Sequence, residues 1–212
     1  MEPMMKERNR KLAQKVIKGL QSRNMEGFYA ETKEEALNLA LGMMEKGATV
    51  GWGGSASIED IGLKKAVCEG DYTVYNRDIC KDAVEKRETE IKILGSDYFL
   101  CSCNAITEDG VLLNIDGNSN RVAAIAYGPK QVIMIVGMNK VAKDEDAAMY
   151  RARNIAAPTN AQRFDVNTPC KTTGACANCK SADSICCQFL MTRFSRHQGR
   201  IKVILINENI GY

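Results

Sequence analysis

The sequence predicts an α/β fold with a mostly parallel sheet flanked by helices. Strand-like apolar runs and helical patterns alternate along most of the 212 residues, which is typical of parallel strands joined by crossover helices. The run within residues 200–208 is nearly continuous in apolar residues, as expected of a strand buried on both faces. A glycine-rich turn at residues 53–56 joins an apolar strand to a helix. We therefore expect one large core in a single domain over residues 1–212.

The spacing of apolar residues and the positions of turn residues predict the individual helices and strands along the chain. Apolar residues at helical spacing predict a first helix over residues 4–20, within a basic N-terminal segment at residues 1–23. Thr32 and Glu35 have the spacing of a capping box, which predicts a second helix that ends at Gly47. The expected later strands are residues 48–52, 72–75, 97–103, 131–137 and 200–208, and the expected later helices are residues 58–66, 78–94 and 144–156.

Two stretches interrupt this alternation. Residues 111–115 and 122–127 are both strand-like and are separated by Asp-Gly-Asn-Ser-Asn, which predicts an inserted β-hairpin. Between residues 160 and 199 the periodicity fades and Pro, Gly and Cys become frequent. We expect an irregular, cysteine-rich insert near the C-terminal end of the sequence.

Composition and charge exclude several classes of protein. With 45% apolar and 26% charged residues, the chain fits a soluble globular protein. No apolar run approaches the roughly 20 residues of a membrane span, and no secretory signal is visible, so we expect a cytoplasmic protein. Residues 1–23 hold seven Lys and Arg against two Glu. Because no nucleic-acid-binding motif accompanies this charge, a solvated helix face is favoured over nucleic-acid binding.

A glycine-rich loop is the first candidate binding site. Gly53, Gly54 and Ser55 lie between a predicted strand and a predicted helix. Backbone N–H groups can approach a ligand there, and the helix dipole favours an anion. The loop matches neither the P-loop nor the dinucleotide-binding fingerprint. It therefore predicts a phosphate or carboxylate site, with a tight turn as the alternative.

Polar residues at other predicted strand ends form the second candidate site. They are Asp109, Asn120, Arg121 and Lys140. Because the carboxyl ends of parallel strands share one edge of a sheet, we expect them to converge beside the glycine loop. Arg121 would hold a substrate carboxylate as a two-pronged donor, Lys140 would add charge, and Asp109 would act as the base. The alternative is that Asp109 and Asn120 cap turns while both cations face water.

Five of the nine cysteines lie within eighteen residues: Cys170, Cys176, Cys179, Cys186 and Cys187. Cytosolic thiols are kept reduced, so this density favours metal or redox chemistry over a disulfide framework. Four thiolates can hold a Zn²⁺ ion or an iron–sulfur cluster, and their spacing here does not choose between them. Adjacent side chains point in different directions, so we expect Cys170, Cys176, Cys179 and Cys186 as the ligands. Free buried thiols are the alternative.

Taken in order, the motifs together resemble the lactate-utilisation (LUD domain) family. The motifs are Gly51-x-Gly-Gly-Ser, Asn104-Ala-Ile-Thr-Glu-Asp-Gly, Asn120-Arg121-Val-Ala, Gly128-Pro129, Val136-Gly-x-Asn-Lys140, Arg151-x-Arg-Asn-x-Ala-Ala-Pro158 and Pro169-Cys-x5-Cys-x2-Cys. The resemblance covers residues 31–211 and fits a short, single-domain version without the paired ferredoxin-type motifs of larger LUD proteins. It implies a fold similar to ribose-5-phosphate isomerase, glucosamine-6-phosphate deaminase and the CoA transferases.

The resemblance also implies a function. It points to the oxidation of L-lactate to pyruvate by a bacterial multi-protein iron–sulfur system, in which this chain would be an oxidoreductase component that binds a small anionic metabolite. Its partners would be other lactate-utilisation proteins. The alternatives are a non-catalytic ligand-binding or regulatory subunit, and an isomerase- or transferase-like enzyme acting on a small carboxylate or sugar phosphate.

Overall fold

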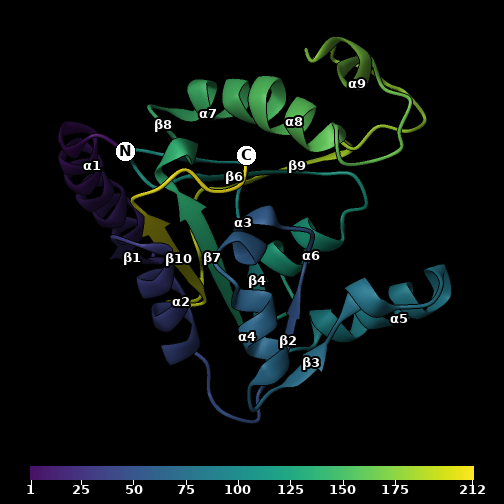
Figure 1. Ribbon diagram of the computed structural model, residues 1–212, viewed down its shortest axis with the longest axis horizontal. Coiled ribbons are helices and arrows are strands. Elements are labelled where there is room, and N and C mark those ends of the chain that lie inside the picture. The colour runs from purple at the N-terminus through teal and green to yellow at the C-terminus, as the bar shows by residue number, and fades with distance from the viewer.

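The computed structural model describes residues 1–212 and has a parallel six-stranded sheet at its centre (Figure 1). The strand order is β1-β10-β7-β4-β2-β3, and every neighbouring pair is parallel. The mostly parallel α/β fold predicted from the sequence is therefore confirmed. The strands are β1 (Glu26–Ala30), β2 (Thr49–Trp52), β3 (Thr73–Tyr75), β4 (Tyr98–Cys101), β7 (Gln131–Gly137) and β10 (Ile201–Ile206).

Helices cover both faces of this sheet. Successive side chains of β7 alternate between two cores, with Met134 in one and Ile133 and Ile135 in the other, as the pleat of a strand requires. No helix combines the length and the apolar character needed to cross a bilayer. The first core packs against α1 (Pro3–Ser22), α5 (Ala83–Leu94) and α6 (Asn120–Ala126), and the second against α2 (Lys33–Gly42), α3 (Ala56–Asp60) and α4 (Leu63–Glu69).

The capping box at the start of α2 is present. The Thr32 hydroxyl accepts a hydrogen bond from the Glu35 N–H at 3.2 Å, and the Glu35 carboxylate accepts one from the Glu31 N–H at 2.7 Å. These two bonds satisfy donors that a helix leaves open at its N-terminus. The helix ends at Gly42, five residues earlier than the sequence predicts.

A second, smaller sheet lies at the carboxyl ends of the first. Its order is β8-β5-β6-β9, with antiparallel pairs on both sides of β6 and a parallel β5–β8 pair. Figure 1 shows this sheet, together with helices α7, α8 and α9, at the end toward which the β7 and β10 arrows point. These elements are β5 (Ala105–Thr107), β6 (Leu112–Asp116), β8 (Val141–Ala142), β9 (Gln188–Thr192), α7 (Glu145–Arg151), α8 (Ala157–Ala161) and α9 (Pro169–Thr173).

The inserted hairpin has a different second strand from the one predicted. β6 pairs with β5, which precedes it, and residues 122–127 belong mainly to α6 instead of forming a strand. Val122 and Ile125, three residues apart, are both buried, which is a helical period. The Asp116 carboxylate accepts hydrogen bonds from the N–H groups of Arg121 and Val122, at 3.0 and 3.1 Å. These bonds stabilise the first turn of the helix.

The helix that begins at Glu145 does not stop before Pro158. A π-helical turn, Ala152–Ala156, connects α7 to α8, and the helix continues to Ala161. Proline lacks an N–H and its ring clashes with the preceding turn of a regular α-helix. The wider π-turn before Pro158 accommodates the proline, so the chain can continue as a helix.

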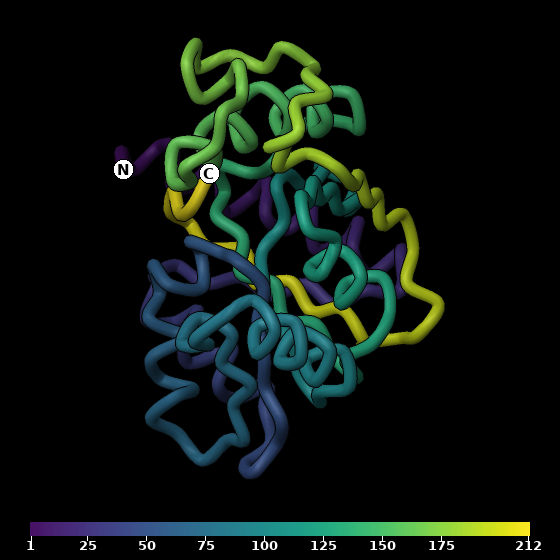
Figure 2. The backbone as a smooth tube through the Cα atoms, turned by 90° about the vertical axis from the view of Figure 1, so that its right-hand side faces the viewer, coloured from purple at the N-terminus to yellow at the C-terminus, as the bar shows by residue number.

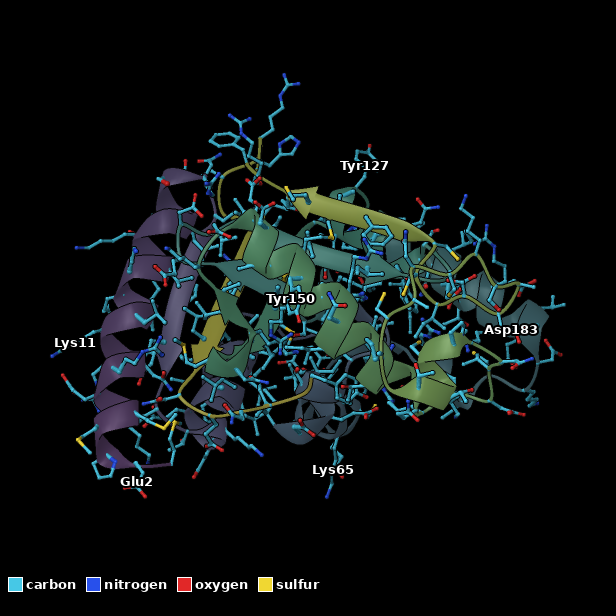
Figure 3. All side chains as sticks on the ribbon, turned by 90° about the horizontal axis from the view of Figure 1, so that it is seen from above. Glu2, Lys11, Lys65, Tyr127, Tyr150 and Asp183 are labelled. Carbon is cyan, nitrogen blue, oxygen red and sulfur yellow. The ribbon has the colours of Figure 1, made fainter.

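The cysteine-rich insert is mostly irregular, as expected, but it contains α9 and β9. Strand β9 pairs with β6 at the edge of the second sheet, where most of its side chains are exposed or half-buried. Figure 3, viewed from above, shows Asp183 of this insert at the opposite end of the molecule from α1, whose Lys11 points away from the body.

Candidate functional site

A polar cavity of about 60 Å³ lies where the carboxyl ends of three neighbouring strands meet. Strand β2 leads into Ser55, β4 leads into Ser102, and β7 leads through a 3₁₀ turn to Lys140. These strands are adjacent in the sheet, so the loops that follow them come together at one edge. We call this the cationic cavity, because its lining includes Arg121, Lys140 and Arg163 but no Asp or Glu.

Lys140 is almost fully buried in this cavity, with 3% of its surface exposed. Its Nζ donates to the hydroxyls of Ser57 and Ser102, at 2.9 and 3.0 Å, and both partners are neutral. Burial, together with the charges of Arg151 and Arg121, lowers the pKa of Lys140 to about 8, although Cys103 and Asp60 oppose this shift. The side chain is thus a buried amine that exchanges its proton near neutral pH.

Arg121 lines the same cavity, but its hydrogen bonds are directed into the protein. Its two terminal nitrogens donate to four acceptors: Asn114 Oδ1 at 2.6 Å, Ser102 O at 3.2 Å, Ile115 O at 2.5 Å and Asn104 Oδ1 at 3.2 Å. A two-pronged contact with a substrate carboxylate, as predicted, would require breaking these bonds. Arg121 therefore contributes positive charge to the cavity and holds the β4 and β6 loops together.

The residues of the glycine-rich loop have two different roles. Gly54 and Ser55 line the cationic cavity, whereas a side chain at Gly53 would begin 3.1 Å from the Arg121 side chain. Gly53 thus allows Arg121 to lie close to the loop. The Ser55 hydroxyl is buried and has no hydrogen-bond partner. Helix α3 after the loop has only five residues, so most of the positive charge comes from the side chains.

Arg163 is a lining residue that sequence analysis missed. It follows α8 at the start of the irregular insert, where neither hydrophobic period nor a strand end marks a site. Its guanidinium lies 5.8 Å from the centre of the Tyr212 ring, and Tyr212 also lines the cavity. This contact positions a fork of N–H donors at the cavity.

Asp109 and Asn120 lie outside the cavity, so the expected convergence includes Arg121 and Lys140 only. The Asp109 carboxylate forms an ion pair with Arg23, the residue that follows α1. A hydrogen bond from Thr107, with the Arg23 contact, lowers the pKa of Asp109 and makes it a weaker base. Asn120 donates to Glu90 Oε1 at 3.2 Å. The turn after β5 faces α1 because β5 belongs to the second sheet, which the strand-end argument did not anticipate.

A second cavity, of about 70 Å³, lies between α8 and the cysteine-rich insert, which forms a lobe above the rest of the chain in Figure 2. Its lining includes the four predicted ligands, Cys170, Cys176, Cys179 and Cys186, and we call it the cysteine cavity. Burial and the neighbouring thiols, first that of Cys170, raise the pKa of Cys186 to about 11. All nine cysteines are free thiols, and no three His, Cys, Asp or Glu side chains are placed to hold one metal ion. The predicted metal thus stays a prediction.

Comparisons with known proteins agree with the motifs. The family model of the LUD domain matches residues 13–206. A DUF162 family protein from Deinococcus radiodurans has a similar crystal structure, with a TM-score of 0.52 and 11% sequence identity over 94% of this chain and 98% of that chain. At this identity the likeness shows the fold alone, and a search of curated proteins finds no significant match. On the strength of the domain match, this chain belongs to the LUD domain family, the lactate-utilisation family that its motifs resemble.

Proposed function

We propose that the cationic cavity binds a small metabolite through a carboxylate or phosphate group, as part of the oxidation of L-lactate to pyruvate. The observation that carries this proposal is a cavity lined by three cationic side chains and by no Asp or Glu. A buried charge without a counter-ion is costly, and Lys140 has only hydroxyl partners. An anionic ligand would supply the missing charge.

Three groups are available to contact such a ligand directly. Lys140 uses two of its three N–H donors on Ser57 and Ser102, which leaves one. The Ser55 hydroxyl is buried without a partner, and the Arg163 guanidinium is held at the cavity by stacking. The enclosed volume of about 60 Å³ restricts the ligand to a small molecule. We infer that Arg163, not Arg121, takes the two-pronged contact.

Membership in the LUD domain family supports a role related to lactate utilisation. As part of the same proposal, the chain acts in the cytoplasm beside other lactate-utilisation proteins. L-Lactate and pyruvate each carry one carboxylate and few other atoms, so both fit the size and the charge of the cavity.

Calorimetric titration with L-lactate, pyruvate and inorganic phosphate tests this proposal. We expect at least one of these anions to bind, and we expect Lys140→Met and Arg163→Gln to weaken its binding at least tenfold. The matched controls are Lys143→Met and Arg196→Gln, which remove one exposed cation each outside the cavity. If no anion binds, or if the control variants lose as much affinity as the cavity variants, the proposal is wrong.

The lowered pKa of Lys140 favours a second candidate function, an isomerase- or transferase-like reaction. A general acid–base group works best when its pKa is close to the operating pH, and burial brings Lys140 there. Such an enzyme would exchange a carbon-bound hydrogen of its substrate with solvent. NMR in D₂O would show exchange that depends on Lys140. If no small carboxylate or sugar phosphate exchanges, this second function is wrong and anion binding is the only function that remains proposed.

A further inference from the structure

We propose that the cysteine cavity holds an iron–sulfur cluster ligated by Cys170, Cys176, Cys179 and Cys186. This site is separate from the cationic cavity, and anion binding does not depend on it. The four thiols come from the first turn of α9, the loop after it and the segment before β9, yet all four line one cavity. None of the other five cysteines lines this cavity.

The spacing of the thiols favours a cluster over a single ion. A tetrahedral Zn²⁺ brings four sulfurs to about 2.3 Å from one point, so its four ligands lie close together. Here the four thiols line one cavity of about 70 Å³, but no three of them are grouped as ligands of one ion. Iron and sulfide atoms of a cluster core would occupy the space between thiolates that a lone ion cannot span.

Backbone contacts hold the ligand-bearing segments in place. The Cys187 N–H donates to the Asp116 carbonyl at 2.9 Å, which fixes the chain next to Cys186 against the end of β6. A side chain at Gly117 would begin 3.0 Å from the backbone of Ile185, so a larger residue there would push the two segments apart by a few tenths of an ångström. On the other side, the Gln162 amide donates to the Cys170 carbonyl at 3.3 Å. The cavity is therefore attached to both the second sheet and α8.

The remaining lining suits a negatively charged cluster. Arg153 lines the cavity and its guanidinium donates to Asn178 Oδ1 at 2.5 Å. Four thiolates give the cluster a net negative charge, which the Arg153 cation would partly offset. Ala157, Pro158 and Phe189 supply apolar walls. Nearby charge and limited solvent exposure are among the features by which proteins tune such clusters.

Cys187 provides a matched control within the same segment. Its thiol is exposed and donates to the Ser184 carbonyl at 3.3 Å, outside the cavity. Replacing Cys187 by Ser therefore changes one cysteine of the same insert without removing a ligand. Cys68, an exposed thiol on α4, gives a second control far along the sequence.

The test is anaerobic purification of the full chain, followed by reconstitution with ferrous iron and sulfide. We expect iron and acid-labile sulfide in equal amounts, with the broad visible absorption of a cluster, and loss of most of both in Cys179→Ser and Cys186→Ser. Cys187→Ser and Cys68→Ser should keep both. Zinc without sulfide, or no metal in the wild-type chain, would overturn the proposal even if a variant failed to fold. Equal iron loss in Cys187→Ser would overturn the ligand assignment.

Discussion

The Lys140 ammonium donates to the Ser57 hydroxyl over 2.9 Å, and the backbone of Gly211 lies directly against this pair. A side chain at Gly211 would begin 2.4 Å from Ser57 Oγ and 3.0 Å from Lys140 Nζ. The Lys140 charge is therefore enclosed by neutral groups and by the chain itself, with the cationic cavity on its open side. This enclosure lowers the pKa of Lys140 and makes its charge depend on pH and on ligand.

Anion binding should weaken as pH rises through about 8. Lys140 binds an anion in its protonated form, and its pKa of about 8 in the free protein rises when the anion arrives. Between the two pKa values, each pH unit should cost up to about tenfold in affinity, because one proton is taken up on binding. Titration calorimetry from pH 6 to 10 measures this slope. In Lys140→Met this slope should disappear. If the slope is unchanged in the variant, the pH dependence of the affinity comes from another group.

Lys140→Met should stabilise the protein at pH 7 even though it weakens binding. The pKa of Lys140 is about 8 in the folded chain against 10.5 for an ordinary lysine, so the unfolded chain binds this proton more tightly. The stability of the wild type therefore rises with pH between about 8 and 10.5, and below pH 8 the buried charge costs about 3 kcal/mol. Denaturation at pH 7 and pH 11 should show a gain for Lys140→Met that shrinks at the higher pH. A loss at pH 7 would contradict the enclosed charge.

Arg121→Ala should lower the stability of the protein as well as its affinity for anions. Removing the guanidinium leaves the acceptors on Asn114, Ile115 and their neighbours without donors. We expect a loss of roughly 3 kcal/mol or more in the free energy of unfolding, because several buried hydrogen bonds to a charged group disappear together. Denaturant titration of this variant beside Arg163→Gln separates the roles. Arg163→Gln should bind weakly with nearly unchanged stability, and an equally stable Arg121→Ala would show that its bonds are dispensable.

The parallel sheet could be predicted because its inner strands are buried on both faces. Residues 131–137 are apolar almost throughout, and they match β7 in both limits. The edge strands β1 and β9 are half-exposed and mixed in composition, so no apolar run marks them. Residues 122–127 carry apolar side chains at both strand and helix spacing. The hydrogen bonds that the Asp116 carboxylate accepts from the first turn of the helix depend on a turn that the sequence does not display.

The candidate site could be predicted most directly where it follows the parallel sheet. Ser55 and Lys140 follow β2 and β7, so the rule that strand ends share one edge places them together. Asp109 follows a strand of the second sheet, whose different orientation turns it toward α1. Arg163 reaches the cavity only because the π-turn lets the helix continue past Pro158, which sequence reasoning treated as the end of the helix.

Gly19→Ala should destabilise the protein, although alanine is the better helix former. Gly19 lies in α1, and a side chain there would begin 2.3 Å from the backbone carbonyl carbon of Asp109. The contact is reciprocal, because a side chain at Gly110 would begin 2.5 Å from the Leu20 nitrogen. Neither backbone can move without separating α1 from the turn after β5. We expect a loss of about 1–3 kcal/mol, which exceeds the gain of up to about 1 kcal/mol in helix propensity.

Gly42→Ala is the matched control for this prediction. Gly42 is also helical, at the end of α2, but a side chain there would meet nothing within 4 Å. Alanine at this position should leave the free energy of unfolding unchanged or raise it by up to about 1 kcal/mol. Denaturant titration of the two variants compares the same chemical change with and without an opposing backbone. If Gly19→Ala were as stable as Gly42→Ala, the close approach of α1 to Asp109 would be absent in solution, and with it the reason why Asp109 lies outside the cationic cavity.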